Sequence, residues 1–302
     1  MISRVTSTTQ MRAAQANLQA SAQRLAQLQE QSSSLKTMNR ASDDPARAAN
    51  AMAVRAEQRA TAQYTRNADN ADGWLTTLDN ALGSSTNILT KVRDLTVQGA
   101  NAGTMSVAAK EALAVQIDGL RQDLLKEANV SYLGRTVFAG NSDAGSVYDA
   151  DGKYTAGVAT GPTAASVERR VGAGSTVRVD VDGGALFGTG TDSVFSLLTT
   201  ISAALRSTDP TVSVSTHLAA IDTSITSVIG ARADVGARQA RVESATSALV
   251  TQKGTLEAQR VQLEDVDLAT VVLDLKLQEV AYQSALAVTA RVIQPTLMDF
   301  LS

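Results

Sequence analysis

Apolar residues recur every seven positions near the start of the chain, a spacing that is typical of a helix packed along a second helix. Two rows, three residues apart, consist of Met11, Leu18 and Leu25, and of Ala14, Ser21, Leu28 and Leu35. Gln and Ser occupy many of the other positions. The pattern predicts a helix over residues 6–36, with an apolar strip so narrow that the helix needs another helix to cover it.

A second strip of this kind lies at the other end of the chain. Its approximate seven-residue spacing is carried by Leu268, Val272, Leu275, Tyr282, Leu286, Ile293 and Phe300. We expect the two terminal helices to pair with each other and with neighbouring subunits. The predicted assembly interface consists of Met11, Leu18, Leu25, Leu28 and Leu35, together with the seven residues of the second strip. Pairing within one chain alone, as in an ordinary helical bundle, is the alternative.

A long helix is predicted from Pro45 to about residue 100. Asp44 can accept hydrogen bonds from free N–H groups as the N-cap, and Pro45 suits the first helical position. Asp43 adds negative charge at the positive end of the helix dipole. A helix of this length, ~80 Å at about 1.5 Å per residue, is typical of bundles and coiled coils.

Further helical patterns follow this long helix. Ser106 is predicted to cap a helix through about residue 129, which folds back because short connections favour antiparallel neighbours. Residues 194–205 and 212–263 are also predicted to be helical, and a last helix is predicted from residue 264 to residue 301.

The middle of the chain has a different character, because twelve of the twenty Gly residues lie between Gly134 and Gly190. Residues 136–139 and 175–181 favour extended strands separated by turns. In the second strand alternate residues are predicted to be buried and exposed. The buried set is Val177, Val179 and Val181, and the exposed set is Arg178, Asp180 and Asp182.

These elements predict a mainly α fold, in which the N- and C-terminal segments form a long antiparallel helical bundle or coiled-coil rod with a small β-rich inserted domain at the tip. Residues 1–44 with 264–302 form the predicted terminal assembly domain. Residues 45–132 with 192–263 form the helical rod domain, and residues 133–191 form the outer domain.

Composition argues against several classes of function. The chain has no Cys, which excludes thiolate chemistry, and 27 basic against 30 acidic residues give no basic surface for nucleic acid. His217 is the single histidine. A Ser-His-Asp arrangement is formally possible, but His217 lies in a predicted helix and we interpret it as a solvated residue there. No residue is predicted to be catalytic, to bind a cofactor or to bind a metal.

Two acidic groups need a structural explanation. Asp43 and Asp44 resemble a metal pair or a catalytic dyad, but helix capping explains both. Glu264, Asp265 and Asp267 are interpreted as the solvated start of the terminal helix, because the Gly-punctuated loop of a calcium site is missing.

Two further features concern the cellular location. No run of about 18 apolar residues predicts a membrane span. Residues 1–6 lack the apolar stretch of a secretory signal peptide. If the chain is exported, we expect a route without a cleaved signal.

A further group of stretches consists of Met1–Thr6, Ser42–Ala46 with its Asp-Asp-Pro turn, Gly134–Gly140, Arg232–Arg238, Glu264–Asp267, Ala281–Leu286 and Leu297–Leu301. In their order and spacing, these stretches resemble the flagellin superfamily and, within it, the hook–filament junction family, hook-associated protein 3. The resemblance covers the whole chain.

The resemblance implies a non-enzymatic structural subunit that forms a homo-oligomeric ring between the hook-side junction protein and the flagellin filament. It also implies an extracellular location in the bacterial flagellum and an export chaperone on the C-terminal helix. Flagellin, the bulk filament subunit, is the nearest alternative, and a coiled-coil secretion-system tip protein is a more remote one.

Overall fold

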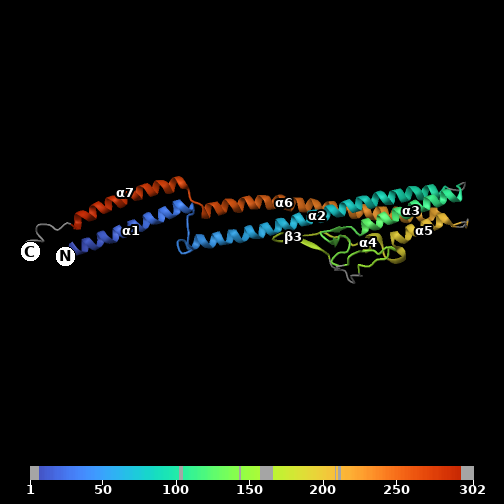
Figure 1. The fold of residues 1–302 in the computed structure, drawn as a ribbon, viewed down its shortest axis with the longest axis horizontal. Coiled ribbons are helices and arrows are strands. Elements are labelled where there is room, and N and C mark those ends of the chain that lie inside the picture. Colours follow the sequence, from blue (N-terminus) through green and yellow to red (C-terminus); the bar gives the residue numbers. More distant parts are fainter. Residues whose placement is uncertain are drawn as a thin grey trace, which may run out of the picture. The chain divides into compact units, whose positions relative to one another are not determined.

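Helices dominate the computed structural model, which describes residues 7–101, 105–142, 144–156, 166–207, 209 and 212–293 (Figure 1). The long helices are α1 (Ser7–Ser34), α2 (Pro45–Ala100), α3 (Val107–Ala128), α5 (Val194–Arg206), α6 (Leu218–Glu264) and α7 (Leu268–Ile293). The short elements are β1 (Ser131–Tyr132), β2 (Arg135–Thr136), β3 (Glu168–Gly172), β4 (Ser175–Arg178), α4 (Gly183–Phe187) and the 3₁₀ turns η1 (Gly190–Asp192) and η2 (Val214–His217).

The chain forms two compact units. Unit 1 contains the described parts of residues 1–60 and 252–302, and unit 2 contains those of residues 61–251. In unit 1, α1 packs along α7 (Figure 1), and α2 and α6 run antiparallel to each other. The predicted mainly α fold, with the first helix paired to the last and the second to the second-to-last, is therefore confirmed.

In unit 2, α2 and α6 each bury a row of residues with strict seven-residue spacing. The row of α2 is Thr61, Ala68, Leu75, Leu82, Leu89 and Thr96, and the row of α6 is Ile221, Val228, Val235, Val242 and Leu249. Every one of these residues is at most 4% exposed. Such spacing keeps one face of a helix against its neighbour over many turns, so the two rows form the axis of the core.

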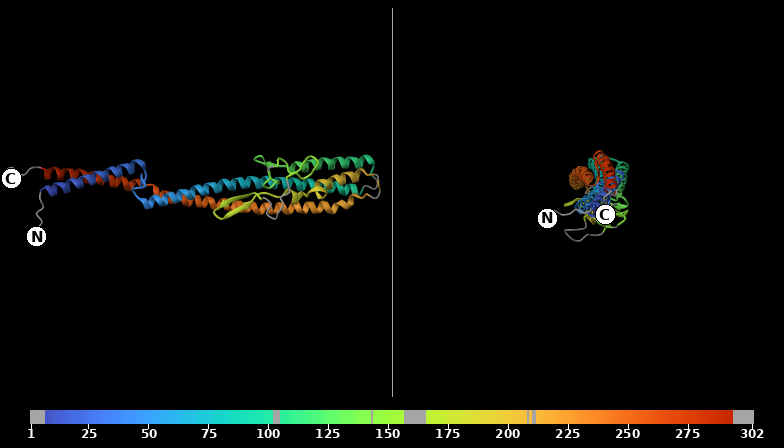
Figure 2. Two further views of the ribbon diagram at one scale, coloured as in Figure 1. Left: turned by 90° about the horizontal axis from the view of Figure 1, so that it is seen from below. Right: turned by 90° about the vertical axis from the view of Figure 1, so that its left-hand side faces the viewer.

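The helices α3 and α5 complete this core, and Figure 2 shows them beside α2 and α6. Their buried residues include Leu113, Ile117 and Leu124 from α3 and Phe195, Leu198 and Ile201 from α5. As predicted, Ser106 caps α3, since its hydroxyl accepts a hydrogen bond from the N–H of Ala109 at 3.2 Å. The helix α6 begins later than predicted, because the 3₁₀ turn η2 precedes it.

The β-rich region packs against the middle of α2. Tyr132 lies edge-on to Trp74, with ring centroids 6.0 Å apart. The Tyr132 hydroxyl also lies close against Gly73, where a Cβ atom would clash with it. On the hairpin of β3 and β4, the guanidinium groups of Arg169 and Arg170 lie over the rings of Trp74 and Tyr64, each 5.8 Å from the ring centroid.

This position differs from the predicted one at the tip of the rod. The C-terminal end of α2 contacts α5 instead, where the Leu205 side chain lies over Gly99. The ring contact of Tyr132 with Trp74 and the cation–π contacts of Arg169 and Arg170 hold the β-rich region against the side of α2.

The second predicted strand is shorter than expected, and one of its outward residues is buried. Val177 and Val179 face the interior as predicted, but Asp180 is only 1% exposed. Its carboxylate accepts hydrogen bonds from the N–H of Val167 at 2.8 Å and from the guanidinium of Arg178. These hydrogen bonds offset the loss of hydration of the buried carboxylate. Strict alternation along a strand predicts an exposed Asp180, because it does not take such donors into account.

Candidate assembly surface

The face of α1 that meets α7 is made of small and medium side chains at alternating spacings of four and three residues. Ala14, Leu18, Ser21, Leu25 and Leu28 lie on this face. Leu28 is 6% exposed, while the other four remain half-buried. The pair of helices therefore covers the predicted strip of α1 only in part.

The matching face of α7 is partly polar. Val271 is buried, and Leu275 and Tyr282 are half-buried. Between them, the Gln278 side-chain amide donates hydrogen bonds to the backbone oxygen and the hydroxyl of Ser21, at 3.2 and 2.9 Å. A polar contact inside a helix pair costs stability but fixes the register of the two helices.

The opposite face of α7 is apolar and exposed. Leu273, Leu277, Val280 and Val288 are between 59% and 65% exposed, and their spacing places them on one side of the helix. We call these four residues the outer strip. A row of exposed apolar side chains along one face of a helix is typical of a surface that a partner covers.

The outward face of α1 is different. It carries polar residues, among them Arg12, Gln19, Gln23, Gln27 and Glu30, which are all exposed. The exposed apolar surface of the helix pair is therefore concentrated on α7.

The remaining predicted interface residues lie at the edges of the pair or outside it. Met11 is 43% exposed, and Leu268, Val272 and Leu286 are between 41% and 49% exposed. Leu35 follows the end of α1 with a positive φ of 56° and lies outside the helical strip. Ile293 is the last residue of α7, with its side chain outside the described set, and Phe300 lies outside the described residues.

The sequence pattern missed the outer strip. A search for one seven-residue row selects the residues that face α1 and their flanks, and it passes over a second apolar row on the same helix. The signal was present in the sequence, because only four charged residues interrupt α7, namely Asp274, Lys276, Glu279 and Arg291.

The turn before α2 is held by its two aspartates. Asp44 accepts a hydrogen bond from the N–H of Arg47 at 2.9 Å, and Pro45 is the first residue of α2. Asp43 accepts from the N–H groups of Asn39 and Arg40, at 3.3 and 2.9 Å. One carboxylate therefore caps the helix and the other closes the preceding turn.

The predicted solvated start of the last helix holds for only part of the acidic group. Asp267 accepts a hydrogen bond from the N–H of Ala269 and lies at the start of α7. Glu264, in contrast, is 5% exposed and receives two hydrogen bonds from Arg55, at 2.6 and 2.7 Å. These bonds lower the pKa of Glu264 below its ordinary value, so the buried carboxylate stays ionised.

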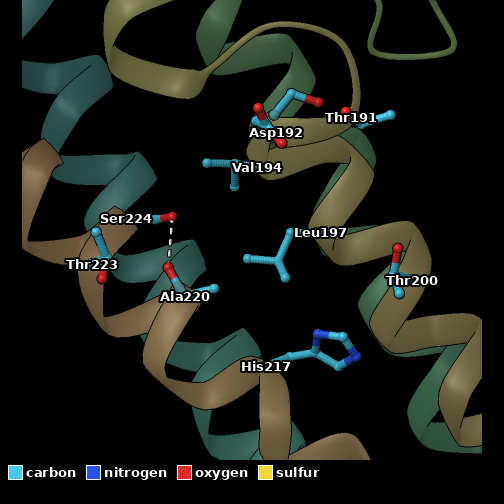
Figure 3. A pocket seen from close by; sticks show the side chains of 10 residues that line it. Thr191, Asp192, Val194, Leu197, Thr200, His217, Ala220, Thr223 and Ser224 are labelled. Atoms are coloured by element: carbon cyan, nitrogen blue, oxygen red, sulfur yellow. Dashed lines mark hydrogen bonds between the residues drawn. The ribbon is translucent and has the colours of Figure 1, made fainter.

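His217 lines a surface cavity of about 530 Å³ between α5 and the start of α6 (Figure 3). Leu197 and Thr200 of α5 line the same cavity, and the hydroxyls of Thr223 and Ser224 donate to carbonyls of their own helix. Within the described residues, no group of three His, Cys, Asp or Glu side chains is placed to hold a metal ion. In the same set, no helix is long and apolar enough to cross a membrane.

Family models match both helical ends of the chain. The bacterial flagellin N-terminal helical region matches residues 5–143, and the bacterial flagellin C-terminal helical region matches residues 218–301. The chain belongs to the flagellin superfamily. Both helices of the terminal pair, and with them the outer strip, fall inside these matches.

Similar proteins within the flagellin superfamily include hook and filament components. The chain is 27% identical over 281 residues to flagellar hook-associated protein 3 of Escherichia coli K12, covering 85% of this chain and 86% of that protein. It is 26% identical over 265 residues to the flagellar filament 30.7 kDa core protein of Treponema maltophilum, covering 87% and 86%. The chain therefore resembles hook-associated and filament proteins to a similar degree in sequence.

The fold is shared with a solved structure of a flagellar hook-associated protein from Vibrio parahaemolyticus. The two superpose with a TM-score of 0.66 at 21% identity, covering 74% of this chain and all of that one. The chain is thus a flagellin-family structural protein with the fold of a hook-associated protein.

Proposed function

We propose that this chain is the junction subunit that links the flagellar hook to the flagellin filament, and that it assembles as a ring through α1 and α7. The role is structural rather than enzymatic. In this proposal the hook-side junction protein lies on one side of the ring and flagellin on the other. The observation that carries the assembly step is the outer strip of α7, whose four apolar side chains are exposed in the single chain.

The predicted interface residues fit the same role. Leu18, Leu25 and Leu275 are half-buried in the α1/α7 pair, so neighbouring subunits can complete their burial. Burial of apolar surface on assembly contributes about 25 cal/mol per Å², which is large enough to stabilise a pair that is marginal alone. A chaperone that covers the outer strip before export is part of the proposal, since this surface would otherwise favour aggregation.

The choice of the junction over the filament rests on the Asp43-Asp44-Pro45 turn and on the hook-associated relatives. The filament subunit remains the second candidate, because the Treponema filament core protein matches at nearly the same identity.

Deletion of the gene distinguishes the two candidates. Loss of a junction subunit leaves intact hooks and flagellin that is released into the medium, because the filament has no base on which to grow. Filaments that still form on the hooks of the deletion strain would contradict the junction role.

Substitution in the outer strip tests the assembly step separately. Leu277→Ser combined with Val280→Ser is expected to abolish incorporation into flagella while the monomer stays folded. The matched control is Val115→Ser, which changes an apolar residue that is 55% exposed on α3 in unit 2. Normal incorporation of the double variant would rule out assembly through this surface.

A further inference from the structure

The two connections that lead into the terminal helix pair run side by side in unit 1. The N–H of Thr37 donates to the carbonyl of Glu264 at 2.8 Å, and the N–H of Val266 donates to the carbonyl of Leu35 at 3.2 Å. The Thr37 hydroxyl adds a bond to the carbonyl of Asp265 at 3.0 Å. Together with the antiparallel bridge of Lys36 and Asp265, these bonds form a short backbone ladder between residues far apart in the sequence.

One ion pair fastens this ladder to α2. Glu264 ends α6, and its side chain is 6% exposed. Arg55 reaches it from α2 with a two-bond contact, Nε to Oε1 at 2.6 Å and a terminal nitrogen to Oε2 at 2.7 Å. A planar guanidinium that meets both carboxylate oxygens fixes direction as well as distance.

Further charges surround Glu264. Arg260 lies 3.6 Å from the Glu264 carboxylate and 3.4 Å from that of Asp265, and it also pairs with Glu257 at 2.8 Å. Because Arg55 and Arg260 both face Glu264, loss of either arginine still leaves the carboxylate with a cation nearby. Arg260 belongs to α6 itself, whereas Arg55 connects the carboxylate to α2.

The backbone at this point is held in an unusual conformation. Leu35 has a φ of 56°, in the left-handed region that branched and bulky residues seldom adopt. Its carbonyl is the acceptor of the bond from Val266. Such a conformation persists when surrounding contacts over-determine it, and the ladder provides those contacts.

We propose that the Arg55–Glu264 pair is a conformational lock. When closed, it holds the ladder against α2 and so fixes the direction of the α1/α7 pair relative to the first turns of α2 within unit 1. When open, it frees the α1/α7 pair to move about residues 35–44 and 265–267. The inference rests on the geometry of unit 1 and does not depend on the junction role.

Spin labels on α1 and α2 test the lock directly. The chain has no Cys, so Gln19→Cys with Met52→Cys creates two unique labelling sites, both exposed and both in unit 1. In the purified full-length protein, we expect a narrow distribution of label-to-label distances. Arg55→Ala and Glu264→Gln are each expected to broaden that distribution about twofold or more.

The matched control is Arg93→Ala. Arg93 forms an ion pair with Asp222 at the same 2.6 Å, also between α2 and α6, but in unit 2 and not next to residues 35–44 or 265–267. This variant is expected to keep the narrow distribution. Arg55→Lys retains the charge without the two-bond contact, so it is expected to give an intermediate width.

Hydrogen exchange gives a second, independent measurement. In Arg55→Ala, the N–H groups of Thr37 and Val266 are expected to exchange about tenfold faster, with the amides of unit 2 unchanged. A broad distribution in the parent protein would overturn the lock, and so would an unchanged distribution in both Arg55→Ala and Glu264→Gln. Equal broadening in Arg93→Ala would also overturn it.

Discussion

The two antiparallel helix pairs of this molecule use the same seven-residue spacing with opposite results. In unit 2, the rows of α2 and α6 are at most 4% exposed, and α3 and α5 complete the core. In unit 1, the α1/α7 pair leaves most of its inward residues half-buried and its outer strip about 60% exposed. The spacing selects the contacting face, but the number of covering helices decides how much of that face is buried.

Side-chain size adds to this difference. The core of unit 2 includes Trp74, Phe195 and a series of leucines, whereas the inward face of α1 alternates Ala and Ser with Leu. Small side chains remove little apolar area from water, so two helices with such faces are stabilised only weakly by each other.

Hydrogen exchange should separate the two regions most clearly. In a verified monomer, amides in residues 68–96 of α2 are expected to exchange at least ~100-fold more slowly than those in residues 11–34 and 268–290, since the terminal pair can open without unit 2. Strong protection of both terminal helices in the monomer would mean that the α1/α7 pair is a complete bundle and needs no neighbour.

Truncation of one leucine in each region should sharpen the comparison. Leu75→Ala removes a side chain that is 0% exposed, and we expect it to lower the free energy of unfolding by about 2–5 kcal/mol. Leu18→Ala removes a half-buried side chain, and we expect a loss of about 1 kcal/mol or less in the monomer. Chemical denaturation of the two variants checks this, and equal losses would remove the distinction between the regions.

Acid should act on unit 1 through Glu264. The pKa of this carboxyl is lowered by the hydrogen bonds from Arg55, and Arg260 and Lys36 add to the effect. A lowered folded-state pKa contributes stability that is present above the unfolded value of about 4.3 and is lost as the pH falls through the folded value.

We therefore expect exchange protection of the Thr37 and Val266 N–H groups to decline below about pH 4. The free energy lost in this way should be smaller than the loss of unfolding free energy in Leu75→Ala. In Glu264→Gln, protection should already be low at neutral pH and nearly independent of acid. If exchange protection of the ladder in the parent protein stayed unchanged down to pH 2, which is about 2 units below the ordinary carboxyl pKa, this prediction would be wrong.

Much of the helical framework can be predicted from the sequence, and its exceptions have local causes. Helix limits at Pro45 and Ser106 follow from capping chemistry, which depends on neighbours in the sequence. The burial of Asp180 depends on donors from Val167 and Arg178, and the position of the β-rich region depends on contacts with Tyr64 and Trp74. The contacts with Val167, Tyr64 and Trp74 join separate segments of the chain, so local patterns do not contain them.

The candidate surface shows the same limit. Leu275 and Tyr282 of the predicted strip lie on the face toward α1. The outer strip was missed because a search for a single seven-residue row finds one apolar face of α7 and passes over a second one. Leu35 continues the predicted row in sequence, yet α1 ends one residue earlier, where the backbone ladder begins. Tertiary hydrogen bonds therefore set the end of the strip.

Trp74 gives the molecule a built-in optical reporter. It is the single tryptophan of the chain, it is 2% exposed, and its ring contacts Tyr132 and the Arg169 guanidinium. Undocking of the β-rich region would expose the indole to water and shift its emission to longer wavelength, while α1 and α7 carry no tryptophan. Fluorescence can thus follow unit 2 alone in a mixture where the terminal helices are associating.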